Sequence, residues 1–271
     1  MNITLADKAL LRLIQLISTM RIREMKHIIT FLIVSLAITI IGCKQDKPAN
    51  NNVTITGSGT LVSQNMELTG FDTVEAGLHF DLVIQQGEQF SVIITSDDNF
   101  IEFIDVVQEA TTISFGLRPE YAYNFYNTTL RAEVTMPEVA GLYLNGSSHA
   151  ELDSLVDVAD FVAELTGSSS LSGELEAESA ALNVYGSTYV KLTGSGKRLQ
   201  LDACGNSITD LSDFYVEDAA LHTSCASTAE VNAAGRIDVD ATQNSRVTYS
   251  GNPALGEVAA HEYAAVELES R

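Results

Sequence analysis

A short hydroxyl-bearing motif repeats six times in the second half of this chain, and its period limits the possible folds. A Ser or Thr returns at intervals of 21, 19, 19, 20 and 18 residues, with a Gly two positions earlier in the first four copies. The six hydroxyl positions are Ser148, Ser169, Thr188, Ser207, Ser227 and Ser245. A period near 20 is too short for a helical-hairpin repeat and matches one coil of a β-solenoid. Gly tolerates φ > 0 and a Ser hydroxyl can bond turn backbone, so each motif is expected at a tight corner.

Apolar residues keep the same phase in every copy of the repeat. One such column lies four residues before the Gly position, at Leu142, Ala163, Leu182, Leu201, Leu221 and Val239. Apolar and polar positions alternate around this column, which is the pattern of strands with one buried face. A coil of this length has room for roughly three strands and three corners. The hairpins of a β-sandwich, the alternative fold, would reverse direction and lose the common phase.

We therefore predict an all-β fold, a parallel β-solenoid with about six regular coils in the C-terminal half, right-handed as parallel crossovers usually are. Residues 53–141 are strand-rich but less repetitive, and we expect them to form an irregular first part of the same body. Residues 80–84 and 90–94 are expected to be strands joined by a hairpin or a tight corner at Gly87. The main loop is expected between Leu117 and Leu130.

The N-terminus has the features of a bacterial lipoprotein signal peptide, at residues 25–43. A basic start is followed by an apolar run of about 14 residues, whereas a membrane span, the alternative, needs ~20. The run ends in Ile-Ile-Gly-Cys, which resembles a lipobox, and we predict lipidation of Cys43. Residues 1–24 look like a start site placed too early. The polar residues 44–52 are expected to be a flexible tether.

Charge and cysteine content narrow the possible partners. Without residues 1–43 the chain keeps 10 basic and 34 acidic side chains, a formal charge of −24 with no basic patch. Nucleic acid is therefore a poor partner, because its binding depends on clustered Lys and Arg. Cys204 and Cys225 fall on neighbouring coils but out of phase, so their Cβ atoms are expected to point apart, which argues against a disulfide even in an oxidising compartment. Neither a CxxC motif nor a His pair accompanies them, and no zinc site is expected.

Several motifs follow one another in a characteristic order. They are Gly57-Ser58-Gly59, the Phe71–Val74 step, Thr95–Asn99, the Gly-Ser repeats and Val247–Pro253. Together they resemble the putative auto-transporter adhesin head GIN domain family (DUF2807), common in lipoproteins of Bacteroidetes. The resemblance implies a parallel β-helix-like fold, a cell-envelope location and no established catalytic residues. We place the domain at residues 53–255, with a C-terminal coil or cap at 256–271, where the motif has decayed to His261-Glu262-Tyr263.

Two groups of residues are candidate sites. The first is an outward polar column in which Asp202, His222 and Asp240 would lie on adjacent coils ~4.8 Å apart and could meet at a cation or a sugar. An outward column is also polar simply because it faces water, and no Ser-His-Asp order, phosphate loop or HExxH motif accompanies it. We therefore predict no catalysis, no cofactor and no bound metal.

The second candidate site is aromatic. It comprises Tyr121, Tyr123, Phe125 and Tyr126, which crowd the main loop of an aromatic-poor chain. Exposed aromatic faces can stack on sugars or enter protein interfaces, and we predict a ligand-binding surface here. The alternative is that these rings alternate along a strand and cover the side of the solenoid.

The sequence thus predicts a non-catalytic outer-membrane lipoprotein, facing the periplasm or the cell surface, that presents a solenoid surface for adhesion or ligand binding. Its expected partners are the membrane, through the N-terminal lipid, and a glycan or a surface protein. One alternative is a glycan-processing β-helix enzyme that uses Asp202, His222 and Asp240. The other is a structural envelope or assembly protein.

Overall fold

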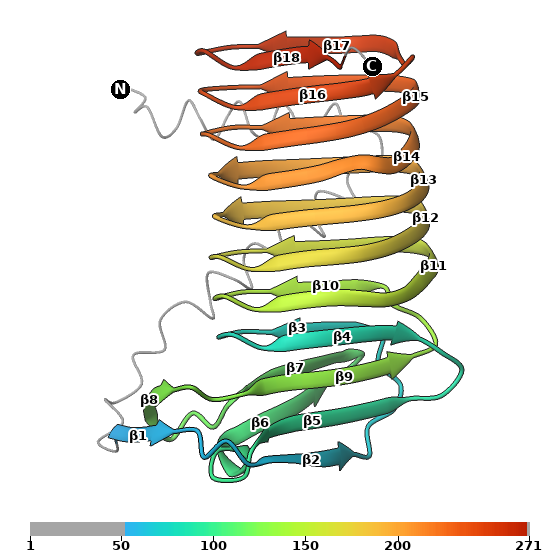
Figure 1. The fold of residues 1–271 in the computed structure, drawn as a ribbon. Helices are drawn as coiled ribbons and strands as arrows, with labels where there is room; N and C mark the ends of the chain where they lie inside the picture. Colours follow the sequence, from blue (N-terminus) through green and yellow to red (C-terminus); the bar gives the residue numbers. More distant parts are fainter. Residues whose placement is uncertain (1–51, 270–271) are drawn as a thin grey trace, which may run out of the picture. The chain divides into compact units, whose positions relative to one another are not determined.

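The computed structural model describes residues 52–269, which belong to one compact unit and form a tall stack of strands (Figure 1). The predicted signal peptide, Cys43 and most of the tether lie outside the described residues. No helix among residues 52–269 is long and apolar enough to cross a membrane.

The elements fall into an irregular N-terminal group and a regular C-terminal group. The first group is β1 (Asn52–Thr56), β2 (Leu61–Met66), β3 (Thr73–Ala76), β4 (Asp81–Gln86), β5 (Ser91–Asp97), the 3-10 helix η1 (Ile101–Phe103), β6 (Ile104–Glu109), β7 (Thr112–Leu117), β8 (Ala122–Tyr126) and β9 (Leu130–Met136). The second group is β10 (Gly141–Leu144), β11 (His149–Leu165), β12 (Ser170–Gly186), β13 (Tyr189–Gly205), β14 (Ile208–Thr223), β15 (Thr228–Ala241), β16 (Arg246–Gly251), β17 (Ala254–Ala260) and β18 (Ala265–Leu268).

The C-terminal group is the predicted parallel β-solenoid. β10 to β15 pair in parallel, each strand with the next along the chain. Leu182, Leu201 and Leu221 are directly opposite one another in this register, and each is at most 4% exposed. The predicted apolar column is therefore confirmed. Residues at the same position of successive repeats stack on one another and form a continuous core along the solenoid axis.

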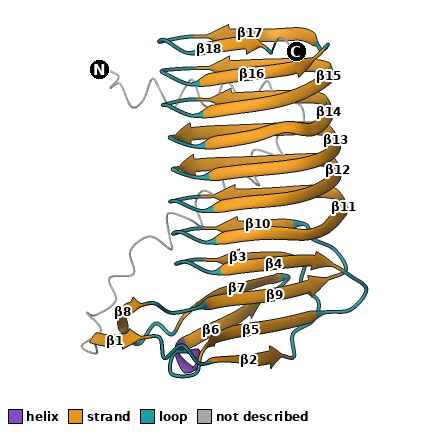
Figure 2. Cartoon of the chain, in the orientation of Figure 1, coloured by secondary structure: helices purple, strands orange, loops and turns teal. Residues whose placement is uncertain are grey.

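The repeated motif forms one tight turn in every coil. These turns lie above one another along one edge of the stack (Figure 2), where φ is positive at Gly146, Gly167, Gly186, Gly205, Cys225, Gln243 and Glu262, and the turn at Leu78, also with positive φ, stacks against Gly146. A Cβ added to Gly167 would come within 2.5 Å of the carbonyl oxygen of Gly146, so glycine permits close stacking of adjacent turns. The Ser148 hydroxyl donates a hydrogen bond of 2.7 Å to the carbonyl of Asn145, as predicted for a corner hydroxyl.

The remaining part of each coil differs from the expected three strands and three corners. A coil such as β12 is one unbroken strand of 17 residues that bends back on itself, and it has a tight turn only at its ends. Register shifts mark the bends of several coils, for example between Leu152 and Val156 of β11 and between Lys191 and Gly194 of β13, whereas β12 and β13 pair with each other through the bend without a shift. Such β-bulges bend a strand without ending its hydrogen-bonded ladder. The alternation of polar and apolar residues in the sequence therefore did not indicate where a coil bends.

The N-terminal group closes the first coil with antiparallel pairing. β5 lies antiparallel to both β2 and β9, and β6 is antiparallel to β7. β4 and β5 are joined by a short corner at residues 87–90, the second of the two expected connections, and do not pair as a hairpin because β9 inserts between them from later in the chain. The expected main loop contains β8, which pairs in parallel with β1 in a small separate sheet.

A buried carboxylate ties these N-terminal strands together. Asp97 is only 1% exposed, and its two oxygens accept hydrogen bonds of 2.8 Å from the backbone N–H groups of Gly59 and Thr129. Next to it, Asn99 donates to the carbonyl of Thr56 and accepts from the N–H of Ser58. Two sequence motifs about 40 residues apart are therefore joined at one point, which fixes the turn between β1 and β2.

Candidate functional site

The structure brings the predicted polar column together on one face of the solenoid. Asp202 is opposite His222, and His222 is opposite Asp240, on β13, β14 and β15. The His222 Nδ1 atom is 3.5 Å from a carboxylate oxygen of Asp240, and both side chains are more than half exposed. With Asp238, Glu257 and other neighbours, the three residues line a shallow groove of about 520 Å³.

The partners and the openness of this column do not favour catalysis. A half-buried phenol shares the face: burial and then the negative charge of Asp202, which also accepts a hydrogen bond from it, raise the pKa of Tyr185 to about 12. Asp202 is thereby occupied by a structural contact. Between residues 52 and 269 no three His, Cys, Asp or Glu side chains are arranged to hold a metal ion. Catalytic carboxylates usually work in sites that exclude water, whereas this groove is open.

The same face carries a more buried acid nearer the N-terminus. Tyr143 on β10 lies between Glu75 on β3 and Glu164 on β11. Burial, and next the charge of Glu75, raise the pKa of the Glu164 carboxyl. Burial and the charges of both acids also raise the pKa of the Tyr143 hydroxyl. These pKa shifts arise first from burial and then from like charges stacked on adjacent coils, and they do not assemble an acid and a base around a cavity.

The aromatic candidate lies at the N-terminal end, on and just before β8, far along the stack from the polar groove (Figure 1). Tyr121 and Tyr123 both pack edge-on against Phe103, at ring separations of 5.8 Å. The Tyr123 hydroxyl donates to the carbonyl of Arg118, and Phe125 packs against the buried Phe100 at 5.5 Å. These three rings alternate along the strand toward the core, whereas Tyr126 points away and is 61% exposed.

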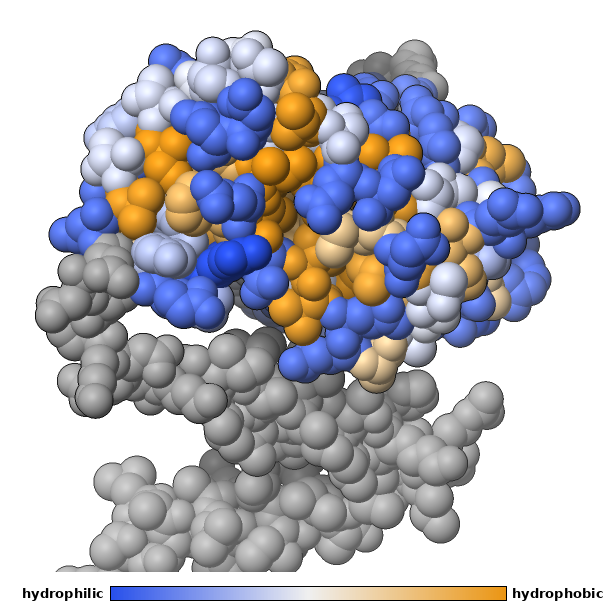
Figure 3. Space-filling view, turned by 90° about the horizontal axis from the view of Figure 1, so that it is seen from below, coloured by the Kyte–Doolittle hydropathy of each residue, from blue (hydrophilic) through white to orange (hydrophobic). Residues whose placement is uncertain are grey.

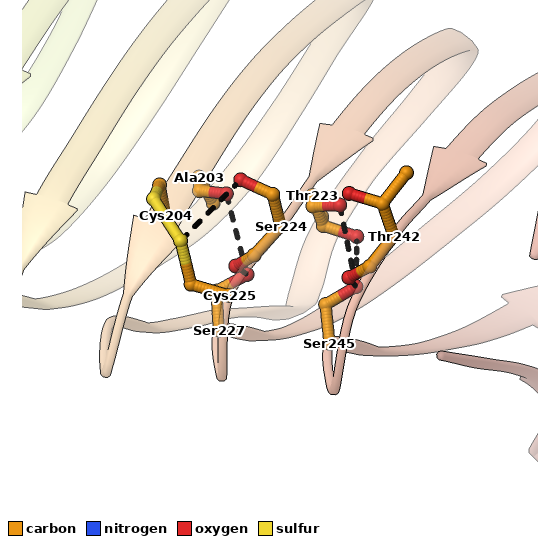
Figure 4. Close-up of a disulfide and its surroundings, with 8 residues drawn as sticks. All are labelled: Ala203, Cys204, Thr223, Ser224, Cys225, Ser227, Thr242 and Ser245. Carbon is orange, nitrogen blue, oxygen red and sulfur yellow. Dashed lines mark hydrogen bonds between the residues drawn. A yellow bond between two sulfur atoms is a disulfide. The ribbon is translucent and has the colours of Figure 1, made fainter. Parts of the chain in front are cut away.

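The stacked turns along the edge of the solenoid, called the turn ridge below, contain a disulfide between Cys204 and Cys225. The Cα atoms of the two cysteines are 5.4 Å apart (Figure 4). The expectation that their Cβ atoms point apart was wrong. Cys225 has a left-handed backbone, with φ of 65°, at the position held by Gly205 one coil earlier. A left-handed residue leaves the in–out alternation of a strand, and the Cys225 side chain therefore turns toward the preceding coil. In the same turn Ser227 donates to the carbonyl of Ser224.

Beside the disulfide, the last turns of the ridge form a wide groove that the sequence reasoning did not select. Its volume is about 900 Å³, and it is lined by Gly205, Asn206, Cys225, Ala226, Gln243, Asn244, Glu262 and Tyr263. Tyr263 is 94% exposed and has a φ of 72°, a conformation that is an outlier for a bulky residue. The available signal was the position of Tyr263 in the decayed final motif, where earlier coils carry Ser168, Ser187 or Asn206.

The groove combines one aromatic wall with amide groups. The Tyr263 ring offers a flat apolar face, and Asn206, Gln243 and Asn244 each carry an amide that can donate and accept hydrogen bonds. Charged side chains contribute little, since Glu262 is the one ionisable neighbour of Tyr263 in the lining. The arrangement suits a polar, uncharged ligand that has apolar faces.

The chain matches a known family over most of its length. Residues 70–253 match the family described as "Putative auto-transporter adhesin, head GIN domain". No curated protein is similar enough in sequence to count as a relative.

Solved structures share the fold at low sequence identity. A putative adhesin from Bacteroides fragilis aligns with a TM-score of 0.73 and 17% identity, over 79% of this chain and all of the other. A putative adhesin from Parabacteroides distasonis gives 0.65 and 14%, over 80% of this chain and all of its own length. A putative lipid binding protein from the same species gives 0.66 and 14%, with the same coverage. At these identities the similarity establishes the fold.

Proposed function

We propose that this chain, which belongs to the putative auto-transporter adhesin head GIN domain family, is a non-catalytic, lipid-anchored envelope protein that binds glycans through the C-terminal turns of its solenoid. The observation that carries the proposal is the exposed, left-handed Tyr263 beside a groove of amide side chains. Unusual backbone conformations held by the surrounding fold concentrate at binding sites.

A sugar ring fits the chemistry of this groove. Its apolar C–H face can stack on the Tyr263 ring while its hydroxyl groups bond with the amides of Asn206, Gln243 and Asn244. The disulfide of Cys225 fixes one wall, so little conformational freedom is lost when a ligand binds. Each site of this kind is shallow, and firm attachment would come from many copies on one cell binding a repetitive glycan.

The position of the groove supports contact with another surface. The predicted lipid at Cys43 is attached before β1, whereas Tyr263 lies between the last two strands. Eight strand-to-strand steps separate β7 from β17 in the sheets, roughly 38 Å at ~4.8 Å each. A protein anchored at its N-terminus would thereby present Tyr263 at its outer end.

The test compares two exposed tyrosines at opposite ends of the molecule. Full-length protein with Tyr263→Ser should lose most of its attachment to a glycan array, because anchoring aromatics often contribute ~2 kcal/mol or more. Tyr126→Ser, at the aromatic candidate of β8, serves as the matched control and should bind normally. Loss with Tyr126→Ser alone would instead assign the ligand to β8, and binding to proteins but not to glycans would change the ligand class.

The lipid anchor is tested separately. Cys43→Ala should release the protein from the membrane fraction, because stable anchoring requires acylation and a single chain binds only marginally. Retention in membranes after a salt wash would contradict the anchor and leave the glycan test unaffected.

The enzyme alternative depends on the groove of Asp202, His222 and Asp240. It predicts turnover of a glycan that Asp202→Asn abolishes, whereas our proposal predicts no turnover with either protein. The structural alternative predicts assemblies of the purified protein and no bound glycan.

A further inference from the structure

The N-terminal end of the solenoid exposes apolar side chains that no described strand covers. Seen along the axis, hydrophobic surface gathers across this end (Figure 3). Among the strands of residues 52–269, β2 pairs only with β5, and its Leu61 and Val62 are 53% and 36% exposed. A groove of about 210 Å³ lies beside it, lined by Met66, Ile94, Ile101, Ile104 and Val106 together with Gln64, Glu102, Asp105 and Arg118. Apolar side chains exposed together on an uncovered strand, as Leu61 and Val62 are, mark an interaction site.

Tyrosines surround this apolar surface. Tyr121 and Tyr123 pack against Phe103, which belongs to η1 together with the groove residue Ile101. Tyr126 lies at the end of the same strand, β8, and is exposed. Tyrosine has an apolar ring and a polar hydroxyl, and it is enriched where a protein meets the boundary between lipid and water.

The length of the chain before β1 limits how far this end can be from a bilayer. Eight residues lie between Cys43 and Asn52, and the nine residue-to-residue steps span at most ~30 Å when the chain is fully extended. We propose that the N-terminal end, comprising β2, η1, β6 and β8, lies on the bilayer that holds the Cys43 lipid, with its apolar side chains at the boundary between headgroups and acyl chains. This inference rests on the proposed anchor at Cys43.

Other occupants fit the surface less well. The tether itself, residues 44–51, consists of polar and charged residues together with Pro48 and Ala49, and has no large apolar side chain that could cover Leu61 and Val62. A second copy would bring Glu102 and Asp105 of one groove toward the same acids of its partner, with Arg118 as the one basic residue in the lining to offset them. These acids also favour uncharged headgroups over anionic ones.

The absence of Trp from the sequence provides a direct test. Full-length acylated protein carrying Leu61→Trp is reconstituted into phosphatidylcholine vesicles, with or without bromine on the upper acyl chains. The matched control is Leu255→Trp on β17, where the native leucine is similarly exposed, at 57% against 53%. Interfacial contact places the β2 probe ~5–10 Å into the headgroup boundary, so the Leu61→Trp variant should lose about half of its fluorescence to brominated lipid and the Leu255→Trp variant almost none.

Each outcome has a distinct meaning. Equal quenching of both probes, or of neither, in vesicle-bound protein would overturn the proposed orientation while the lipid anchor stands. Protein that does not stay on the vesicles would refute the anchor itself. A concentration-dependent blue shift of the β2 probe without lipid, unaffected by brominated lipid, would assign the surface to a second copy. Replacing half of the phosphatidylcholine with phosphatidylglycerol should weaken the quenching of the β2 probe, and a stronger signal would contradict the uncharged-lipid assignment.

Discussion

The two ends of the solenoid differ in how they finish the stack. At the N-terminal end, antiparallel strands and the buried Asp97 close the first coil. At the C-terminal end, the last coil carries apolar residues in the same columns but nothing described stacks on them. Ile237 is 0% exposed and its neighbour Leu255 is 57% exposed, although both occupy one column. The comparison shows that burial in a solenoid depends on the presence of the next coil as much as on the residue type.

The largest expected effect tests this dependence on position. Leu201→Asp should unfold the regular coils, because it places an unpaired carboxylate in a fully stacked column. Leu201→Ala should cost about 2–5 kcal/mol through the cavity it leaves. Val258→Asp changes the same column at the open end, where the residue is 39% exposed, and should alter stability by about 0.5 kcal/mol or less. Chemical denaturation of all three variants measures the difference, and equal losses would refute it.

The next effect concerns the closed end. Asp97→Ala would remove the acceptor of two part-buried hydrogen bonds, those donated by the N–H groups of Gly59 and Thr129. Each unsatisfied group costs about 1–3 kcal/mol, so the midpoint of thermal unfolding should fall clearly. Asp98→Ala is the control, since the Asp98 side chain is exposed and accepts its hydrogen bond from the Ser58 hydroxyl. Similar melting temperatures for the two variants would mean that Asp97 does not hold the end together.

A smaller effect is expected from the disulfide near the open end. Replacing Cys204 and Cys225 with Ser should cost about 3 kcal/mol, since the bond closes a loop of 21 residues in the unfolded chain. Dithiothreitol should lower the melting temperature of the native protein by a comparable amount and leave the Ser variant unchanged. Native protein that melts identically with and without reductant would contradict this role.

The smallest expected effect is the pH dependence of stability caused by Glu164, a residue between the two ends of the solenoid. Burial and Glu75 raise the pKa of Glu164 in the folded protein, so the folded state binds this proton more tightly than the unfolded chain does. Glu164 therefore reduces stability at neutral pH, and the loss is recovered as pH falls through the folded pKa toward the ordinary value of 4.5. Glu164→Gln should raise stability at pH 7 by no more than about 0.5 kcal/mol and flatten its pH dependence. A variant that is less stable at pH 7 would contradict the sign.

The sequence predicted the regular coils because their contacts repeat at a fixed separation. The positions of Leu182, Leu201 and Leu221 follow from period and phase alone. Insertion of β9 between β4 and β5 was not predictable in this way, because that pairing depends on contacts far apart in the chain. The Cys204–Cys225 pairing was missed since the phase argument assumed strand geometry at a residue that has a left-handed turn conformation.

The candidate sites were predicted unevenly for a related reason. The column of Asp202, His222 and Asp240 was found, because register alone brings these residues together. Tyr263 was not selected, because its exposure depends on the open end of the stack and on its turn conformation. Its place in the decaying motif was visible, but a decayed repeat gives no indication of which side chains remain uncovered.

The disulfide also determines how the protein would respond to tension. Backbone hydrogen bonds run along the solenoid axis, so a pull between Tyr263 and Cys43 would peel the coils one bond at a time from the outer end. At Cys225 the load passes through the sulfur atoms to Cys204 and bypasses the coil between them. That coil has to shear off as a unit. The 21-residue stretch between the two cysteines, roughly 70 Å of extended chain, cannot lengthen under the load until the disulfide is reduced. Redox state would thereby set how far an attached protein stretches before it fails.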